Sequence, residues 1–476
     1  MPMQPSWLNA SASTRVGRRH LVALWVGVAI AWTACASFAQ TQVNRKHKET
    51  LLAPFPPEAR ESLVIGPEGR RVAFLAKADG GQRVVVDGKE EKTYQQAAGL
   101  TFSPDEKILA YAAKNGDQWV IVAGGKEWGP YARVGPPVFS PDSAHLAFVA
   151  MLPDGRRAVV VDGKPGATYD LVFEGRIAFS ADGVHMAYGV QKGGAWYVVA
   201  DGKEIGPYEF LGSASGLHFS RDGTRLAYAA QVNKKWSLVL DGKAQTPYDN
   251  LGDLAISPDG RRVAYAVLQG EKWFVVADGK PGTEFDAIGE GTLQFSLDSK
   301  RLVYAAQTGK QWQAVLDGKS GKLYDRIGQM LFSRQSAALA YTARLGDQAM
   351  VVLDDKEGRP FDRVGDGTLT FSPSGRRLAY IARSGKVTFA VVDGKRKPRY
   401  GMVGYVTFTP DGQSVLYAAA QTTRKTFTVV DDKATAYAYD EIWMPPGGRF
   451  TFTGPKKYYY LATKDAKMYL VEEELD

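Results

Sequence analysis

The chain has 476 residues, a formal net charge of +8, 45% hydrophobic residues, 51 glycines and a single cysteine. This length and composition are typical of a large, turn-rich soluble β protein. One cysteine excludes an internal disulfide framework, and so mild a charge over so long a chain does not indicate a nucleic-acid partner.

Residues 1–39 have the pattern of a secretory signal peptide. Arg15, Arg18 and Arg19 form a basic region, and the apolar stretch from Leu21 to Trp32 is too short to span a bilayer. Ser37-Phe38-Ala39 then offers a small-residue cleavage site before Gln40. The sequence therefore predicts export to the periplasm or out of a bacterial cell, and no later stretch is long and apolar enough for a transmembrane span.

The lone Cys35 leaves a second possibility open. Trp32-Thr33-Ala34-Cys35 loosely resembles a bacterial lipobox, although Trp32 stands where leucine is usual. A lipid anchor at Cys35 is the less favoured alternative to cleavage after Ala39, which would leave a mature chain without cysteine. Residues 40–48 are predicted to be a short linker before the folded region, residues 49–476.

Two short motifs then recur with a period of 37 to 40 residues. The first is Asp-Gly-Lys or a close variant, and it begins at Asp87, Gly124, Asp162, Asp201, Asp241, Asp278, Asp317, Asp354, Asp393 and Asp431. The second resembles Phe-Ser-Pro-Asp and begins at Phe102, Phe139, Phe179, Phe219, Ile256, Phe295, Phe332, Phe371 and Phe408. A fixed period in this range indicates one supersecondary unit copied many times.

Each unit contains four short apolar runs separated by turn residues, with no helical period. In the unit from Phe219 to Ile256, Leu226–Ala230 and Trp236–Leu240 are of strand length, and Asp241-Gly242 is a strong hairpin signal. Four antiparallel strands in about 40 residues match a β-propeller blade. Glycines such as Gly242 and Gly279 are predicted to have positive φ, and Asp355 and Asp432 to take the same conformation.

The repeats also resemble a known family. Phe-Ser-Pro-Asp-Gly followed by Leu-Ala-Tyr is similar to the TolB-like, WD-related propeller repeat of bacterial exported proteins, over about residues 60–462. The strict Trp-Asp and Gly-His markers of the eukaryotic repeat are missing. The resemblance implies a propeller and a binding role, and it implies no particular ligand.

Closure of the array is left open by the sequence. Strands at Lys457–Leu461 and Met468–Val471 lack a fourth partner, which the segment Glu49–Val64 could supply as a composite blade. The count is then ten to eleven blades, whereas propellers typically have four to eight. The two arrangements are one large ring and two packed propellers divided near residues 255–295, and the usual blade number slightly favours the second.

A search for catalytic or metal-binding residues gives little. His145, His185 and His218 lie at strand positions of three different units, and no His-x-x-x-His or Cys-x-x-Cys pair could begin a zinc site. Most carboxylates lie in hairpin turns, where Asp suits the backbone geometry. We therefore expect no metal, no cofactor and no catalytic residue.

Cations gather in the loops between the second and third strands. Ring geometry would bring these loops to one face, where clustered positive charge could attract an anionic partner. The candidate binding cations are Lys192, Lys234, Lys235, Lys272, Lys310, Arg344, Arg383, Arg424 and Lys425. Ordinary solvated surface charge is the other interpretation of the same residues, and we favour it.

Tryptophans open several third strands beside these loops. Trp196, Trp236, Trp273 and Trp312 each stand five residues before the Asp-Gly-Lys position. Aromatic side chains beside polar groups suit glycan or peptide recognition, but tryptophans repeated in register more often pack between blades, which is the favoured interpretation.

These observations predict an exported, non-enzymatic propeller that binds a protein or cell-envelope component through one face. The alternative is a glycan- or peptide-processing enzyme with its site at the propeller channel. Such an enzyme would need unlike acidic or histidine residues that converge at the channel and break the blade symmetry. A third hypothesis is a structural or assembly module anchored by lipid.

Overall fold

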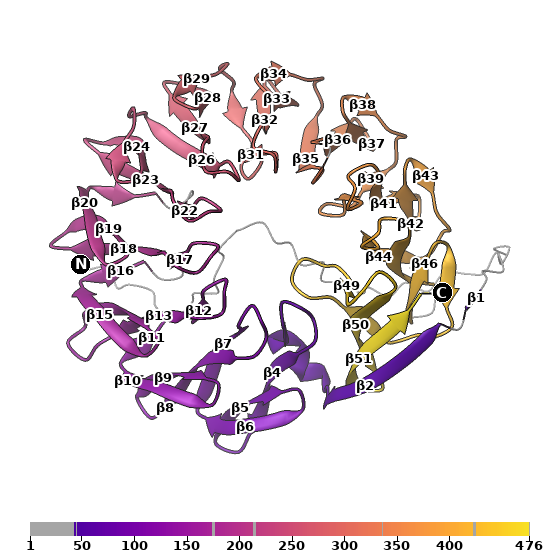
Figure 1. Ribbon diagram of the computed structural model, residues 1–476, viewed down its shortest axis with the longest axis horizontal. Helices are drawn as coiled ribbons and strands as arrows, with labels where there is room; N and C mark the ends of the chain where they lie inside the picture. The colour runs from indigo at the N-terminus through magenta and orange to yellow at the C-terminus, as the bar shows by residue number, and fades with distance from the viewer. Residues whose placement is uncertain are drawn as a thin grey trace. The chain divides into compact units, whose positions relative to one another are not determined.

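The computed structural model describes residues 42–43, 45–173, 177–212, 216–335, 337–421 and 425–475. Strands make up 59% of the protein and helix 1%, so the prediction of an all-β propeller is confirmed. Eleven small sheets stand side by side in a ring (Figure 1). The predicted signal peptide, Cys35 and Arg424 lie outside the described residues.

Blades 1 to 5 follow one another along the chain, and each has its first strand or strand pair innermost and its last strand at the rim. Their strands are β3 (Val64–Ile65), β4 (Val72–Ala78), β5 (Gly81–Val86) and β6 (Lys89–Tyr94); β7 (Gln96–Phe102), β8 (Leu109–Asn115), β9 (Gln118–Ala123) and β10 (Lys126–Tyr131); β11 (Arg133–Val134), β12 (Val138–Phe139), β13 (Leu146–Met151), β14 (Arg157–Val161) and β15 (Lys164–Tyr169); β16 (Leu171–Val172), β17 (Ala178–Phe179), β18 (Met186–Lys192), β19 (Ala195–Ala200) and β20 (Lys203–Tyr208); and β21 (Phe210–Leu211), β22 (Leu217–Phe219), β23 (Leu226–Val232), β24 (Lys235–Leu240) and β25 (Lys243–Ala244).

Blades 6 to 11 continue the same order. Their strands are β26 (Asn250–Ile256), β27 (Val263–Gln269), β28 (Lys272–Ala277) and β29 (Lys280–Pro281); β30 (Ala287–Ile288), β31 (Gln294–Phe295), β32 (Leu302–Thr308), β33 (Gln311–Leu316) and β34 (Lys319–Ser320); β35 (Arg326–Phe332), β36 (Leu339–Leu345), β37 (Gln348–Leu353) and β38 (Lys356–Glu357); β39 (Arg363–Val364), β40 (Thr370–Phe371), β41 (Leu378–Ser384), β42 (Val387–Val392) and β43 (Lys395–Arg396); β44 (Met402–Phe408), β45 (Val415–Ala420), β46 (Thr426–Val430) and β47 (Lys433–Thr435); and β48 (Glu441–Trp443), β49 (Thr451–Phe452), β50 (Lys457–Lys464) and β51 (Lys467–Glu474).

The hairpin turns have the predicted backbone. Asp241 and Gly242 both have positive φ, 51° and 77°, as a type I′ turn requires. Gly279 has a φ of 77°, and Asp355 and Asp432 take the same region with φ of 61° and 70°. The prediction for these turns is therefore confirmed.

The hydrophobic core is divided among the blade junctions. The described residues form eleven clusters, each of which joins two neighbouring blades, and one of them joins blade 11 to blade 1 through Leu461, Met468, Val72 and Phe74. Packing continues through residues 255–295, where Ile256 and Phe295 belong to successive clusters. Of the two arrangements left open by the sequence, the structure has the single ring.

The N-terminal segment closes this ring. The strand β2 (Lys46–Pro54) pairs antiparallel with β51 and supplies the fourth strand of blade 11. The predicted composite blade is therefore present, but the added strand begins three residues earlier than Glu49. The 3₁₀ helix η1 (Pro57–Ser62) follows it, and β1 (Gln42–Val43) pairs parallel with β47 at the rim of blade 10.

A buried acid fixes this closure. Glu473 of β51 is 2% exposed and accepts hydrogen bonds from the hydroxyls of Tyr458 and Tyr460 at 2.5 and 2.6 Å. Arg45, on the N-terminal segment, places its Nη1 3.5 Å from Glu473 Oε2 and donates from Nη2 to the carbonyl of Lys433 at 2.6 Å. This cluster ties the N-terminal segment to blades 10 and 11.

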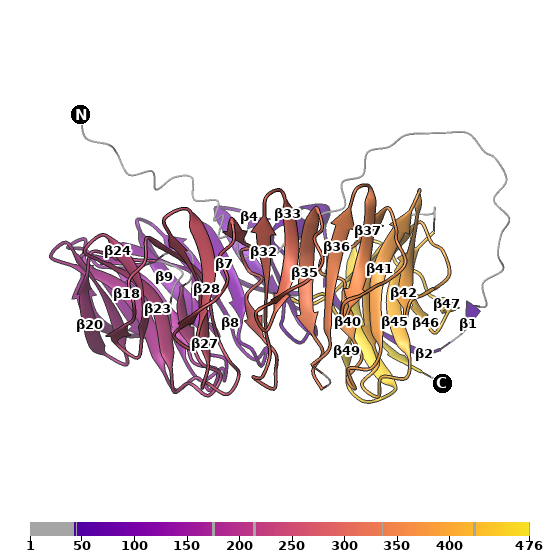
Figure 2. The ribbon, with the colours of Figure 1, turned by 90° about the horizontal axis from the view of Figure 1, so that it is seen from above.

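Antiparallel pairing gives the ring two different faces, which are seen edge-on in Figure 2. The turn face carries the Phe-Ser-Pro-Asp turns and, nearer the rim, the Asp-Gly-Lys turns. The loop face carries the loops between second and third strands and the connections between blades. Among the residues described, no helix is long and apolar enough to cross a membrane.

Candidate functional site

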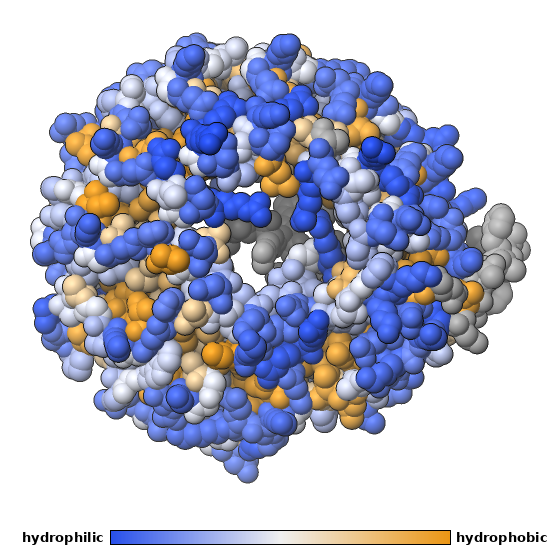
Figure 3. All heavy atoms as spheres, viewed as in Figure 1, coloured by the Kyte–Doolittle hydropathy of each residue, from blue (hydrophilic) through white to orange (hydrophobic). Residues whose placement is uncertain are grey.

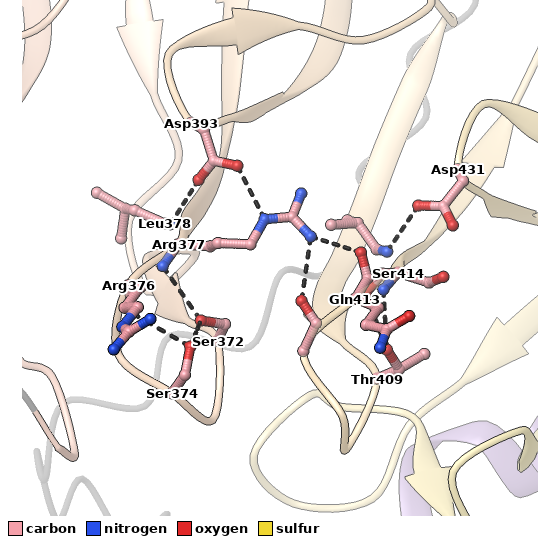
Figure 4. Close-up of polar contacts among 12 residues, drawn as sticks. Ser372, Ser374, Arg376, Arg377, Leu378, Asp393, Thr409, Gln413, Ser414 and Asp431 are labelled. Carbon is pink, nitrogen blue, oxygen red and sulfur yellow. Dashed lines mark hydrogen bonds and ion pairs between the residues drawn. The ribbon is translucent and has the colours of Figure 1, made fainter.

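The turn face is built from a repeated polar network, shown for blade 9 in Figure 4. Asp393, in the left-handed region with a φ of 51°, accepts the Leu378 N–H at 3.0 Å and the Arg377 Nε–H at 2.9 Å. Arg377 also donates to the Gly412 and Gln413 carbonyls of blade 10, at 3.1 and 2.5 Å. One arginine thus joins its own hairpin turn to the next blade.

The same network recurs around the ring. Arg71, Arg225, Arg262 and Arg301 pair with the turn aspartates of their own blades. In blades 3 and 4, His145 and His185 take the place of the arginine and lie 2.7 Å from Asp162 and Asp201. These histidines and aspartates serve the fold, and no group of three potential metal ligands occurs in the described parts of the chain.

The lysines of the Asp-Gly-Lys turns are different from these paired residues. All ten are exposed, and none of their amino groups has an ion-pair or hydrogen-bond partner within the described ranges. They are Lys89, Lys126, Lys164, Lys203, Lys243, Lys280, Lys319, Lys356, Lys395 and Lys433.

The glutamates next to four of these lysines do not compensate them. Glu90, Glu127, Glu204 and Glu357 begin the fourth strands, but each pairs with another cation: Arg83, Lys92, Lys192 or Lys322. The lysines therefore form an outer ring of unpaired positive charge on the turn face, which we call the lysine ring.

Aspartates form an inner ring on the same face. Asp222 accepts hydrogen bonds from the Ser220 hydroxyl and the Thr224 N–H, and these bonds lower its pKa. Asp142, Asp182 and Asp259 are held in the same way in their own blades. Because these turns adjoin the innermost strands, the aspartates lie nearer the centre of the turn face than the lysine ring does, and the exposed cations Arg221, Arg261, Lys300 and Arg376 lie in the same inner turns. Figure 3 shows a largely hydrophilic face of the ring with a hollow at its centre.

On the loop face, many of the predicted cations are already paired. Trp273 and Phe285 form a bridge between strands, which places Lys272 beside Asp286 with a hydrogen bond of 2.6 Å. This bond raises the pKa of Lys272 and lowers that of Asp286. Lys235 pairs with Asp249 in blade 5 by the same geometry.

The remaining predicted cations are less uniform. Lys425 donates to Asp440 at 2.5 Å and Lys192 to Glu204 at 3.1 Å, while Arg344 and Arg383 donate to carbonyls of their own loops at 3.0 and 2.8 Å. No partner of the Lys234 or Lys310 amino group is found among the residues described. The loops bring these cations to one face, but pairing reduces the positive charge there.

Aspartates of the loop face also organise their loops. Asp286 accepts the Gly309 N–H at 2.6 Å, and Asp325 accepts the Gly346 N–H at 2.7 Å. The sequence contains a signal for these ion pairs. A lysine stands directly before the tryptophan, and an aspartate stands directly after the aromatic residue that pairs with it, so the two charged residues become neighbours when the aromatic residues pair.

The predicted tryptophans lie in the blade junctions. Trp196 is 8% exposed and stacks on Phe173, with ring centroids 4.5 Å apart. Trp236, Trp273 and Trp312 are partly buried against the clusters that join blades 5 and 6, 6 and 7, and 7 and 8. Their positions agree with the packing interpretation.

No family model and no curated protein matches the chain. Similar solved structures include a eukaryotic initiation factor, with 15% identity, 78% of this chain and 97% of that one covered, and a TM-score of 0.41. TolB from Acinetobacter baumannii has 14% identity, 53% and 80% coverage and a TM-score of 0.25. KlHsv2 with loop 6CD replaced by a Gly-Ser linker has 11% sequence identity and a TM-score of 0.26, and the match covers 52% of this chain and 88% of that one. All three TM-scores are below 0.5, so membership of a TolB-like family stays a prediction.

Proposed function

We propose that the protein is an exported, non-enzymatic scaffold that binds an acidic protein or cell-envelope component through its turn face. The observation that carries this proposal is the lysine ring, in which ten lysines at one blade position are exposed and have no partner for their amino groups among the described residues. The paired cations of the loop face offer a partner less uncompensated charge, so the proposal moves from the predicted loops to the opposite face.

The charge pattern defines the partner further. Exposed lysines cost little to keep unpaired in water, and charges of one sign spread over a face steer an oppositely charged partner towards it. The lysine ring lies at the outer turns of the blades. A partner with acidic groups in an annular or peripheral arrangement therefore fits this face best.

Capture from envelope extract with matched variants tests the proposal. The turn-face variant changes Lys203, Lys243, Lys280 and Lys319 to Glu, and the loop-face variant changes Lys234, Lys310, Arg344 and Arg383 to Glu. Both variants alter the net charge equally. Exposed substitutions of this kind change the free energy of unfolding by about 0.5 kcal/mol or less each.

We expect the parent and the loop-face variant to retain the same proteins, which salt should elute because exposed charge pairs are screened. The turn-face variant should lose them. Retention of the same proteins by the turn-face variant, combined with their loss from the loop-face variant, would return the binding face to the predicted loops.

A further inference from the structure

Two blade junctions hold the same ion pair at the rim. Between blades 1 and 2, Glu127 accepts hydrogen bonds from the Lys92 amino group at 2.6 Å and from the Tyr94 hydroxyl at 2.7 Å. These two donors lower the pKa of Glu127. The glutamate directly follows the lysine of its blade's turn, and the two donors end the fourth strand of the preceding blade.

The junction between blades 7 and 8 repeats this arrangement. Glu357 accepts from the Lys322 amino group at 2.8 Å and from the Tyr324 hydroxyl at 2.9 Å. The residues occupy the same turn positions as their counterparts in blades 1 and 2. The rim position is therefore a recurring place for a carboxylate between a cation and an aromatic residue.

The junction between blades 8 and 9 keeps the cation and the aromatic residue but reverses the sign of the third residue. Arg359 stands at the lysine position, Phe361 at the tyrosine position and Arg396 at the glutamate position. The Arg396 guanidinium lies over the rings of Phe361 and Phe389, with Cζ 5.2 and 4.9 Å from the centroids. Phe361 has no hydroxyl, and among the described residues no carboxylate stands opposite it to accept a hydrogen bond. The loss of the tyrosine hydroxyl therefore matches the replacement of the glutamate by Arg396.

Both arginines remain available. Arg359 and Arg396 are exposed, and within the described part of the chain neither has a carboxylate partner. Arg396 is held in place by its two aromatic contacts, which reduces the conformational freedom that binding would otherwise remove.

The surroundings increase the positive charge. Lys395 and Arg399 belong to the same outer segment, are exposed and have no carboxylate partner among the described residues, while Lys397 pairs with Asp432 at 3.1 Å. The outer strands β38 and β43 lie at the rim of the ring (Figure 1).

We propose that the rim between blades 8 and 9 binds a carboxylate of an acidic segment in a partner protein, held between Arg359 and Arg396. The partner supplies the glutamate that the chain itself supplies at the other two junctions. Guanidinium groups bind carboxylates in strong, charge-assisted hydrogen bonds. Lys395 belongs to both the lysine ring and the surroundings of this site, but the two arginines that would bind the carboxylate lie outside the ring, so the site stands if that ring has no binding role.

A fluorescent hexaglutamate peptide and the full chain test this site by anisotropy at low salt. Arg396→Glu rebuilds the intramolecular pair with Arg359, so it should weaken peptide binding at least about tenfold without lowering Tm. Arg396→Gln should also weaken peptide binding, although it creates no new ion pair. This variant replaces Arg396→Glu in the test if the charge reversal disturbs folding. Arg376→Glu, an exposed change on the turn of the same blade, is the matched control and should bind nearly as the parent does.

Equal peptide binding by the parent and both Arg396 variants would overturn the site. An equal loss of peptide binding in Arg376→Glu would also overturn it, because it would show that the peptide is attracted by the overall positive charge and not by this site. Inorganic phosphate is the competing probe. If phosphate displaces the peptide at concentrations where acetate does not, the site prefers phosphate and the carboxylate assignment is wrong. If the four-lysine turn-face variant still binds the peptide, the rim site is supported independently of the proposed function.

Discussion

Lys272 donates a hydrogen bond to Asp286 over 2.6 Å on the loop face, and the Lys235–Asp249 pair repeats the relationship one blade earlier. On the opposite face the equally regular lysines of the Asp-Gly-Lys turns have no such partner in the described residues. The two faces of one repeat therefore differ in free charge, although both carry many cations. This difference is the physical basis of the proposed binding face.

The backbone conformation of the hairpin turns can be tested at a glycine where an added side chain would meet no steric clash. A Cβ added at Gly279 would meet nothing within 4 Å, but its φ of 77° disfavours β-branched residues. Gly279→Val should lower the free energy of unfolding by about 1 kcal/mol or more. Gly279→Asp is the control, because Asp355 and Asp432 occupy the equivalent position, and it should cost less in urea unfolding. Equal stability of the parent and the Val variant would contradict the turn assignment.

Stability should fall in acid. Hydrogen bonds from Ser220 and Ser257 hydroxyls lower the pKa of Asp222 and Asp259, and other turn aspartates are held similarly. Because the folded-state pKa lies below the unfolded value of about 3.9, this stabilisation is present above that value and is lost as pH falls through the folded-state pKa. Calorimetry should show Tm dropping steeply below about pH 4. A constant Tm down to pH 2 would argue against these contacts.

The buried cluster at the ring closure should be sensitive to charge. Glu473→Gln leaves the Arg45 guanidinium buried without an anion, so the free energy of unfolding should fall by about 3–5 kcal/mol. The double variant Arg45→Met/Glu473→Gln removes both charges and should recover part of that loss. Equal stability of the parent and the Glu473→Gln variant in urea unfolding would show that the ion pair does not hold the closure.

Removal of the closing strand tests the composite blade. Deletion of residues 46–54 removes β2 and leaves β51 as an unpaired edge, which promotes aggregation. Size-exclusion chromatography should show self-association, and Tm should fall, relative to a control chain that begins at Gln42. A deleted chain that stays monomeric with the same Tm would mean that the ring does not depend on this strand.

Local chemistry made much of the fold predictable. Asp241-Gly242 identifies its turn because few residues accept positive φ, and the missing fourth strand of blade 11 follows from the strand count. The number of blades in one ring depends on the angle between neighbouring sheets, which no local pattern records. The cluster of Glu473 with Arg45 joins distant parts of the chain, so spacing gave no sign of it. The unpaired positive charge of the turn face could not be predicted from the sequence, because only the structure shows which cations have a carboxylate partner.

Hydrogen–deuterium exchange of the protein, alone and with a captured partner, tests the central claim most directly. Binding through the turn face should slow exchange in the hairpins at residues 241–244, 278–281 and 317–320, with little change in the loops at 232–235 and 269–272. Protection confined to those loops, with unchanged exchange in the Asp-Gly-Lys hairpins, would contradict the account.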